Sequence, residues 1–367
     1  MNNTVAILST GNEVVAGDIQ NSNTRDIAQR LKDANIRVAI HMAVNDIESD
    51  IISALHYLKQ QCSAIIVTGG LGPTSDDRTR FALSALCDQE LFFDQGSWDH
   101  IQQIFSKFNK PVPEINRQQC YFPKEASIIT NTQGTANACR FDWQDTTFFL
   151  LPGPPRECLP IVDDVVLPQL IERGYASFCV RLNYLLLGVG ESDIADKIEP
   201  YFSDGTDVEL GYRASFPYIQ VKLSAVSESA LASMRQLIEP IIAPYLVSDS
   251  GRTATEQLVA MVEQLSYSVC ILDRVSYGRW QSHLVTPATN TQLRFSEELS
   301  STCQIILSGI DLITSPHSEK LMYTLKCQLN DHTVLYEYQA PRRGIRTLNS
   351  VVEWASWKAL TFLTEHG

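Results

Sequence analysis

The stretch Ala64-Ile65-Ile66-Val67-Thr68-Gly69-Gly70-Leu71-Gly72-Pro73-Thr74-Ser75-Asp76-Asp77-Arg78-Thr79 decides how the chain is expected to fold. Its apolar beginning predicts a buried strand, its three glycines allow a tight turn, and its paired aspartates precede an expected helix start. Backbone N–H groups in such a turn can bind phosphate oxygens, and hard cations prefer carboxylate ligands. The stretch therefore predicts a site for a phosphate ester and a divalent cation, with the phosphate on the amides of residues 69–72 and the metal on Asp76 and Asp77.

The aspartate pair has a second interpretation. Carboxylates are favoured at the positive end of a helix, so one of the two can cap the helix that follows. Only one of two adjacent carboxylates can act as a cap, which leaves the other available as a ligand.

Strands and helices alternate on either side of this stretch. Strands are predicted at 5–8, 37–43, 64–67 and 148–151, with helices opening near residues 22–23 and, by the spacing of a capping box, at 45–48. Alternation over short connections predicts an α/β fold with a mostly parallel sheet covered on both faces. Ligands bind beyond the carboxyl ends of such strands, where the glycine-rich stretch lies.

Two more loops follow strands of the same predicted sheet. Residues 10–13 come after the first strand, and Glu13 there is either a ligand or an ordinary turn carboxylate. Residues 152–157 come after the strand at 148–151, with prolines that suit the first positions of a helix. We expect this last loop to face the glycine-rich loop across the sheet edge; the alternative is a rigid turn without a ligand.

Length and composition restrict the class of protein. A chain of 367 residues exceeds one ordinary core and predicts two or three domains. The formal net charge of −13 argues against nucleic-acid binding, and a basic cluster at Arg342, Arg343 and Arg346 is more typical of a solvated face. No apolar run approaches the ~20 residues that cross a bilayer, and the N-terminus lacks the layout of a signal peptide. The nine cysteines are scattered without a CxxC pair, so we expect reduced thiols, no membrane partner and a cytoplasmic location.

The pattern changes after about residue 177. Residues 177–248 predict a small α+β unit, with strands at 182–187, 207–212 and 219–225 and helices at 192–201 and 229–245. Residues 248–251 look like a linker. The segment 252–367 opens with a helix from residue 253, continues with strands at 269–272, 305–307 and 334–338, and closes with a helix at 348–363.

Seven segments, in order along the chain, resemble one known family: residues 10–17, 21–23, 68–79, 116–119, 134–136, 151–157 and 188–192. Residues 1 to about 170 resemble the CinA-type (competence/damage-inducible) relatives of the molybdopterin-binding fold. The resemblance implies a three-layer, MoaB/Mog-like N-terminal domain at 1–172, a KH-like middle domain at 177–248, and an α/β C-terminal domain of the nicotinamide-mononucleotide amidohydrolase type at 252–367. It also implies a homodimer.

The same resemblance implies an activity and a set of site residues. The activity is divalent-metal-dependent hydrolysis of a nucleotide pyrophosphate, with ADP-ribose split to AMP and ribose 5-phosphate and Mg²⁺, Mn²⁺ or Co²⁺ as the metal. The implied catalytic residues are Asp76, Asp77 and Glu13, with Glu13 or Asp46 assisting as metal ligand or base. The implied ligand-binding residues are Gly11, Asn23, Gly69, Gly70, Gly72, Thr74, Thr79, Asn116, Gly134, Thr135, Pro152 and Gly153.

A non-catalytic alternative stays open for the N-terminal site. The wider fold family binds pterin phosphates, and such a ligand presents a phosphate to the same loops. In that case the chain is a regulatory protein that binds a molybdopterin-like ligand or a nucleotide without cleaving it.

The C-terminal segment departs from its family. Active amidohydrolases carry a Ser nucleophile in the loop Ala-Glu-Ser-Cys-Thr-Gly-Gly, where this chain has Leu272-Asp273-Arg274-Val275-Ser276-Tyr277-Gly278. Arg274 stands at the nucleophile position and cannot attack a carbonyl. A second signature, Thr-Gly-Ile-Ala-Gly-Pro, is replaced by Ser308-Gly309-Ile310-Asp311-Leu312-Ile313. We therefore expect this segment to be catalytically inactive. In the middle segment, Gly188-Val189-Gly190-Glu191 lacks the Gly-x-x-Gly spacing with which KH modules clamp nucleic acid.

Overall fold

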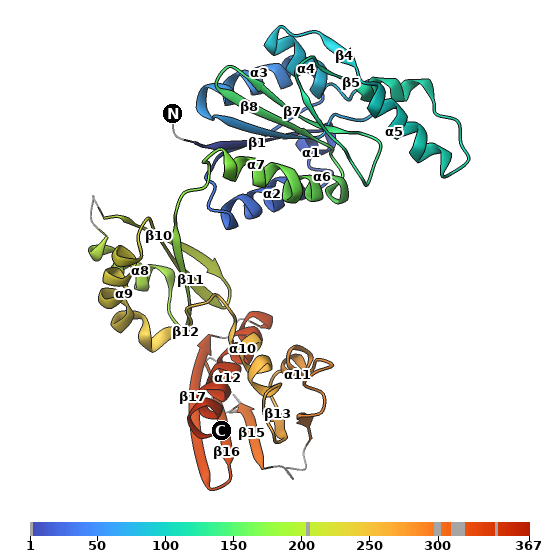
Figure 1. Cartoon of the computed structure of the whole chain (residues 1–367). Helices are drawn as coiled ribbons and strands as arrows, with labels where there is room; N and C mark the ends of the chain where they lie inside the picture. Colours follow the sequence, from blue (N-terminus) through green and yellow to red (C-terminus); the bar gives the residue numbers. More distant parts are fainter. Residues whose placement is uncertain (1–2, 203–205, 297–301, 310–319, 342–343) are drawn as a thin grey trace. The chain divides into compact units, whose positions relative to one another are not determined.

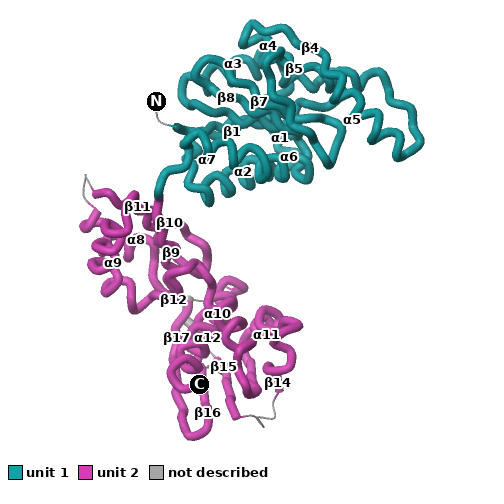
Figure 2. The backbone as a smooth tube through the Cα atoms, in the orientation of Figure 1, with its two compact units in different colours: residues 1–178 teal, residues 179–367 magenta. Residues whose placement is uncertain are grey.

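The computed structural model describes residues 3–202, 206–296, 302–309, 320–341 and 344–367. It divides into two compact units, residues 1–178 and 179–367, which are described separately (Figures 1 and 2). Arg342 and Arg343 of the basic cluster, and residues 310–313 of the second amidohydrolase signature, lie outside the described residues.

Unit 1 is built on a six-stranded sheet in the order β2-β1-β3-β8-β7-β6. The four parallel strands are β1 (Val5–Thr10), β2 (Val38–Val44), β3 (Ala64–Thr68) and β8 (Thr146–Leu151). Two antiparallel strands, β7 (Ala138–Trp143) and β6 (Ser127–Ile129), complete one edge. The predicted mostly parallel sheet is confirmed.

Helices cover both faces of this sheet and give three layers (Figure 1). One face packs against α2 (Ser22–Asp33), α6 (Pro155–Ile161), the π-helical turn η2 (Val162–Val166) and α7 (Leu167–Glu172). The other packs against α3 (Glu48–Gln61) and α4 (Thr79–Cys87). Successive side chains of a strand point to opposite faces, so Ile7 lies in one core and Leu8 in the other. This explains why the central strands are apolar without alternation.

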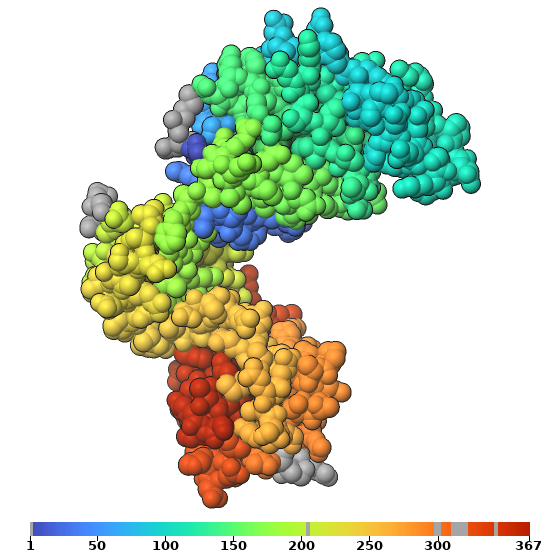
Figure 3. Space-filling model, viewed as in Figure 1, coloured from blue at the N-terminus to red at the C-terminus, as the bar shows by residue number. Residues whose placement is uncertain are grey.

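An extension of unit 1 was not predicted. It consists of β4 (Leu91–Phe93), α5 (Gln95–Ser106), the 3₁₀ helix η1 (Glu114–Cys120) and β5 (Tyr121–Pro123), with β4 and β5 paired antiparallel. Figure 3 shows α5 and the following segment, in teal, projecting from the body of the unit.

Unit 2 contains two sheets. The first has the order β10-β11-β9-β12 and is antiparallel, and the second has the order β14-β13-β15-β16-β17 and is mixed. The first comprises β9 (Val180–Leu187), β10 (Val208–Ser215), β11 (Tyr218–Ala225) and β12 (Leu246–Ser248), with α8 (Glu191–Ile198), η3 (Glu199–Tyr201), α9 (Glu228–Ile242) and η4 (Ala243–Tyr245). The second comprises β13 (Val269–Asp273), β14 (Leu293–Phe295), β15 (Cys303–Gly309), β16 (Lys320–Leu329) and β17 (His332–Pro341), with α10 (Ala254–Val262), α11 (Arg279–Leu284) and α12 (Ile345–His366).

The predicted linker at 248–251 is wrong. Ser248 belongs to β12 and pairs with Leu185 of β9, and Ser250 forms a bridge with Asn183. Leu185 and Leu187 share one core with the helices of the second sheet, such as α10 through Leu258. The α+β and α/β parts that were predicted are both present, but the connection between them is a paired strand because these residues complete the first sheet.

Among the helices that the structure describes, none combines the length and the apolar character that a bilayer crossing requires.

Candidate functional site

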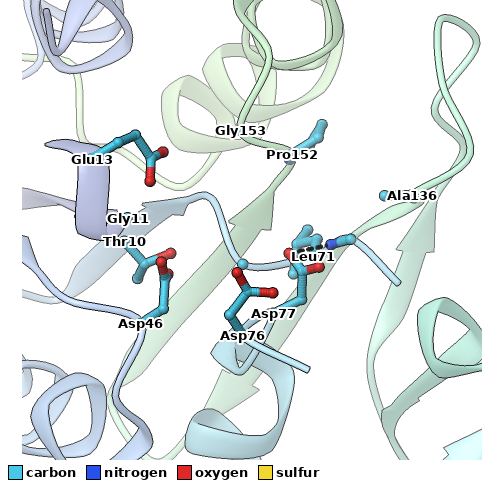
Figure 4. Close-up of a pocket in the computed structure, with 12 residues that line it drawn as sticks. Thr10, Gly11, Glu13, Asp46, Leu71, Asp76, Asp77, Ala136, Pro152 and Gly153 are labelled. Atoms are coloured by element: carbon cyan, nitrogen blue, oxygen red, sulfur yellow. Dashed lines mark hydrogen bonds between the residues drawn. The ribbon is translucent and has the colours of Figure 1, made fainter. Parts of the chain in front are cut away.

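Two cavities meet at the carboxyl ends of the parallel strands in unit 1. The first has a volume of about 230 Å³ and lies among the loops that follow β1, β2, β3 and β8 (Figure 4). Its lining residues are Thr10, Gly11, Glu13, Asp46, Gly70, Leu71, Gly72, Asp76, Asp77, Ala136, Pro152 and Gly153. Eight of the fifteen residues that the resemblance implies for catalysis or ligand binding line this cavity: Gly11, Glu13, Gly70, Gly72, Asp76, Asp77, Pro152 and Gly153. Asp46, the other possible base, lines it as well.

The second cavity, of about 270 Å³, shares Thr10, Glu13 and Gly153 with the first. It is lined by Ser9, Val14, Ile19, Gln20, Asn21, Ser22, Asn23, Thr68, Pro154 and Pro155 in addition. Asn23 donates from Nδ2 to Thr68 Oγ1 at 2.8 Å and to the Gly153 carbonyl at 2.5 Å, and no partner for its buried Oδ1 lies in the part of the chain that the structure describes. The expectation that the loops after β3 and β8 face each other is met, since Asn23 joins them.

The glycine-rich loop needs glycine at two of its positions. Gly69 has φ 108° and Gly70 has φ 65°, values that other residues rarely adopt. A Cβ atom at Gly69 would collide with the Thr10 carbonyl, and one at Gly70 would collide with Thr79 Oγ1. The close approach of β1, β3 and the start of α4 therefore depends on these two glycines.

Asp77 closes this loop upon itself. Its Oδ1 accepts from the Gly72 amide at 2.7 Å, and its Oδ2 accepts from the Thr74 amide at 2.8 Å and from Thr74 Oγ1 at 2.6 Å. The cap of α4 is Arg78, which makes no side-chain capping bond. Asp77 thus fixes the loop rather than the helix, although it still lines the cavity.

Asp76 is exposed at the rim of the cavity. A hydrogen bond with the Thr74 side chain, followed by one with its own backbone, lowers the pKa of its carboxyl group. Asp76 is therefore ionised at neutral pH and positioned to bind a cation at the cavity rim.

Asp46 contributes a carboxylate from the loop after β2. Its Oδ2 accepts from the Asn12 amide at 3.0 Å, and its own amide donates to Asn12 Oδ1 at 3.2 Å. The capping box expected at 45–48 is therefore wrong, because α3 begins at Glu48 with Ile47 as a cap that makes no side-chain bond. Burial, and then the nearby charges of Glu13, Asp76 and Asp77, raise the pKa of Asp46.

The donor set fits a cation that is shared with a phosphate ligand. Within the described ranges, no group of three His, Cys, Asp or Glu side chains is arranged to hold a metal ion alone. Carboxylates nevertheless surround the cavity (Figure 4), and their mutual repulsion favours a bound cation. Mg²⁺ is commonly held by one or two carboxylates together with substrate phosphates, which is the arrangement that this cavity allows.

Backbone donors lie in the same cavity. The amides of Gly70 and Leu71 have no hydrogen-bond acceptor among the residues that the structure describes, whereas the Gly69 amide donates to the Leu151 carbonyl at 3.1 Å. Gly70 and Leu71 both line the first cavity. Unused amides on a tight turn are the groups that bind phosphate oxygens.

Several residues implied by the resemblance lie outside both cavities. Thr79 is fully buried and donates to the Gly69 carbonyl at 2.8 Å, and Asn116 is buried within η1. Thr135 accepts from Gln119 at 3.2 Å, and a Cβ at Gly134 would collide with the Glu157 carboxylate. These residues, with Gly69 and Thr74, shape the loops around the site; a direct ligand contact for them stays a prediction.

Other residues of the site were not predicted. Ala136 lines the first cavity, and Gln118 donates to the Thr74 carbonyl at 2.7 Å, tying η1 to the glycine-rich loop. Both stand inside the segments that carry the resemblance, so their position in the motifs was the available signal.

The C-terminal loop at 272–278 takes a different form. Ser276 is fully buried; its hydroxyl donates to Asp273 Oδ2 and accepts from the Trp280 amide at 2.9 Å. Arg274 is exposed, and Tyr277 is 92% exposed with φ 55°. Ser276 is therefore part of a helix-start hydrogen-bond network and is not open to a substrate.

Comparisons with known proteins agree with the architecture of unit 1. Residues 6–172 match the family described as "Probable molybdopterin binding domain". A "Putative competence-damage inducible protein" of Clostridium botulinum (strain 657 / Type Ba4) is 32% identical over 261 residues, which are 70% of this chain and 64% of that protein. A "CinA-like protein" of Citrifermentans bemidjiense is 30% identical over 276 residues, which are 75% of this chain and 66% of that protein.

Among solved structures, the protein CinA with unknown function from Thermoplasma acidophilum is 23% identical with a TM-score of 0.43, covering 46% of this chain and 99% of that one. Fold, site and sequence relatives together define a protein whose first unit is a molybdopterin-binding-like domain. The chain belongs to the CinA-like family. It spans somewhat less than two thirds of the length of the Clostridium botulinum and Citrifermentans bemidjiense relatives.

Proposed function

We propose that unit 1 hydrolyses a nucleotide pyrophosphate in a divalent-metal-dependent reaction, splitting ADP-ribose to AMP and ribose 5-phosphate. The observation that carries the proposal is one cavity in which the unused amides of Gly70 and Leu71 lie beside the carboxylates of Asp46 and Asp76. Amides suit a phosphate and carboxylates suit a cation, so both halves of a metal–pyrophosphate complex find partners there.

The proposed reaction is attack of water on one phosphorus of the pyrophosphate. The bridging P–O bond breaks, one phosphate gains the hydroxyl group of water, and the other leaves with the bridging oxygen. A bound divalent cation supplies neutralisation of the negative charge on the phosphates. Asp76 holds that cation, the amides of Gly70 and Leu71 orient one phosphate, and Asp46, whose pKa is raised, takes the proton from water. Glu13 shares the cavity and assists as ligand or base.

The test is to incubate the purified protein with ADP-ribose and Mg²⁺, Mn²⁺ or Co²⁺ and to measure AMP and ribose 5-phosphate. We expect metal-dependent release that EDTA abolishes and that Asp76→Asn reduces by about 100-fold. Because Asp76 is exposed, Asp76→Asn should keep the melting temperature of the wild type. Equal rates of AMP release in wild type and Asp76→Asn would contradict the role of Asp76.

A second candidate is a regulatory protein that binds a pterin phosphate or a nucleotide without cleaving it. It is favoured by the match of residues 6–172 to a family described as a probable molybdopterin binding domain. Measurable binding of a phosphate-bearing ligand without any product would support this candidate over hydrolysis.

Three further properties are proposed on the basis of family membership and of the cysteines. The chain forms a homodimer, which light scattering of the purified protein tests. The C-terminal site is inactive towards nicotinamide mononucleotide, because Ser276 is buried. The protein works in the cytoplasm, in keeping with described cysteines that form no disulfide with one another.

A further inference from the structure

Arg80 is a cation buried beneath the glycine-rich loop. It stands at the second position of α4, has no exposed surface, and lies over the Phe122 ring with its Cζ 5.8 Å from the ring centroid. No ion pair of Arg80 is found in the part of the chain that the structure describes. A buried charge without a paired carboxylate opposes folding, so its presence needs an explanation.

The hydrogen bonds of Arg80 all end on one loop. Its Nη2 donates to the Leu71 carbonyl at 3.1 Å and to the Gly72 carbonyl at 3.3 Å. Its Nε and Nη1 are buried without a partner among the described residues. Arg80 is therefore poorly satisfied as a core residue and is directed at the backbone of the glycine-rich loop.

The peptide group between Leu71 and Gly72 is held at both ends. Arg80 binds its carbonyl oxygen, and Asp77 binds its N–H at 2.7 Å. The two side chains act on the same peptide plane, one by donating and one by accepting. Rotation of this plane by half a turn would break both bonds at once and would bring the Leu71 carbonyl towards the carboxylate of Asp77.

We propose that Arg80 is a positioning residue that locks the Leu71–Gly72 peptide, so that the loop keeps the turn in which the amides of Gly70 and Leu71 remain available to a phosphate. This inference rests on the proposed function for its consequence in catalysis, but the lock itself is a property of the loop. The alternative is that Arg80 only fills space in the core.

The charge of Arg80 persists throughout the neutral pH range. Burial lowers the pKa of its guanidinium group to about 10, which still leaves it protonated at pH 7. The hydrogen bonds from Arg80 to the loop are therefore present at any ordinary assay pH. Deprotonation of wild-type Arg80 cannot produce the same effect as its replacement by Met.

The test compares Arg80→Met and Arg80→Lys with the matched control Arg78→Met. Arg78 is the helix cap two positions away, is about a third exposed, and pairs with Glu48 at 2.5 Å, so its replacement removes the same charge without touching the loop carbonyls. Amide hydrogen exchange at single-residue resolution, the melting temperature, and binding of inorganic pyrophosphate with Mg²⁺ are measured for each variant of the full chain.

We expect exchange of the Gly72 amide to rise by about tenfold or more in Arg80→Met and pyrophosphate binding to weaken by about 10- to 100-fold. The Thr74 amide, which Asp77 holds independently, should exchange as in the wild type. The melting temperature should be unchanged or higher, because Met removes an unsatisfied buried charge. Arg80→Lys should recover part of the lost binding, and Arg78→Met should match the wild type in exchange and binding.

Two outcomes would overturn the lock. One is Gly72 exchange and pyrophosphate binding at wild-type levels in Arg80→Met; the other is faster exchange throughout unit 1 with a lower melting temperature, which would make Arg80 a packing residue. Absence of ADP-ribose hydrolysis in the wild type would contradict the proposed function only, since the exchange measurement tests the lock without any turnover.

Discussion

Two loops of this chain, one in each unit, begin alike and end differently. Each follows a buried strand that has a parallel neighbour on both sides, β3 in unit 1 and β13 in unit 2. Each is closed by an aspartate that accepts two backbone N–H groups: Asp77 from Gly72 and Thr74, and Asp273 from Val275 and Ser276. An aspartate-closed turn at the carboxyl end of a strand is therefore common to both loops.

The loops differ in which amides remain for a ligand. Asp77 reaches back along the chain, so Gly70 and Leu71, which precede its bonds, keep their amides at a cavity. Asp273 comes first and binds the amides that follow it, and it holds the Ser276 hydroxyl as well. The order of aspartate and amides along the chain therefore distinguishes the loop that we propose to bind phosphate from the loop whose amides are already bound by its own aspartate.

The largest effect is expected from alanine at the positive-φ glycines of the two loops. Gly70→Ala adds a Cβ that collides with Thr79, on top of the strain at φ 65°, and should destabilise unit 1 by about 2–4 kcal/mol and reduce ADP-ribose hydrolysis by at least about 100-fold. Gly278→Ala, at φ 79° with nothing within 4 Å of the added atom, should cost about 1 kcal/mol and leave hydrolysis unchanged. Thermal unfolding and steady-state rates measure both.

Gly153→Ala is the control within the site, because the nearest atom to its Cβ would be Gly69 Cα at 3.6 Å, an ordinary contact. Its melting temperature should stay close to that of the wild type. Equal destabilisation by Gly70→Ala and Gly278→Ala would mean that crowding against Thr79 is not the cause.

The second prediction concerns replacement by asparagine of the aspartate that closes each loop, Asp77 in unit 1 and Asp273 in unit 2. The two carboxylate oxygens of Asp77 accept three hydrogen bonds, and Asp77→Asn leaves only one acceptor oxygen for them. The substitution should destabilise unit 1 by about 1–3 kcal/mol and reduce the rate of hydrolysis by about 10- to 100-fold. Asp273→Asn should destabilise unit 2 by a similar amount with no loss of hydrolysis. A loss of hydrolysis in Asp273→Asn would contradict the separation of the two loops.

Much of the fold was predictable because its strands are short and strongly patterned. The runs before Gly69 and before Pro152 are apolar without alternation, as in a strand buried on both faces, and they predicted β3 and β8 correctly. The strand β16 was missed although Tyr323, Leu325, Cys327 and Leu329 alternate with polar residues, a period of two that marks a strand with one buried face. The linker prediction failed because Ser248 and Ser250 have turn-forming side chains but find partners in β9, a long-range pairing that local composition does not record.

The site was predictable as a set of loops but not as a set of bonds. The position of Glu13, Asp76 and Gly153 beyond strand ends placed them at one edge of the sheet, and one cavity contains all three. The hydrogen bonds of Asp77 with Gly72 and of Arg80 with Leu71 depend on the path of the backbone through the turn. Sequence spacing alone could not show that Asp77 closes the loop or that Arg80 contacts its backbone. Arg80 in particular was not predicted to take part in the site.

A smaller effect is expected from the hydroxyl of the C-terminal loop. Ser276→Ala removes a bond to Asp273 and an acceptor for the Trp280 amide, and should destabilise unit 2 by about 1–2 kcal/mol. Neither the wild type nor Ser276→Ala should release ammonia from nicotinamide mononucleotide, because Arg274 occupies the nucleophile position and Ser276 is buried. Ammonia release by the wild type that disappears in Ser276→Ala would show that the unit 2 loop is catalytic after all.

The smallest effect is a pH-dependent change in stability at Asp46, which lies near three other carboxylates of the unit 1 site. The unit 2 loop is closed by the single aspartate Asp273. The pKa of Asp46 is raised in the folded protein by burial and by Glu13, Asp76 and Asp77. Above that raised pKa, the negative charge of Asp46 therefore destabilises the folded state. The destabilisation disappears as the pH falls, because the folded state takes up the proton at a higher pH than the unfolded state does. Asp46→Asn keeps an oxygen for the Asn12 amide but removes the charge. Its melting temperature should therefore exceed that of the wild type by about 1 °C at pH 7, a small gain because solvent screens the repulsion, and the difference should vanish towards pH 4. A gain that grows on acidification would mean that the pKa of Asp46 is not raised in the folded protein, and the proposal that the cavity carboxylates bind a cation would lose one of its electrostatic supports.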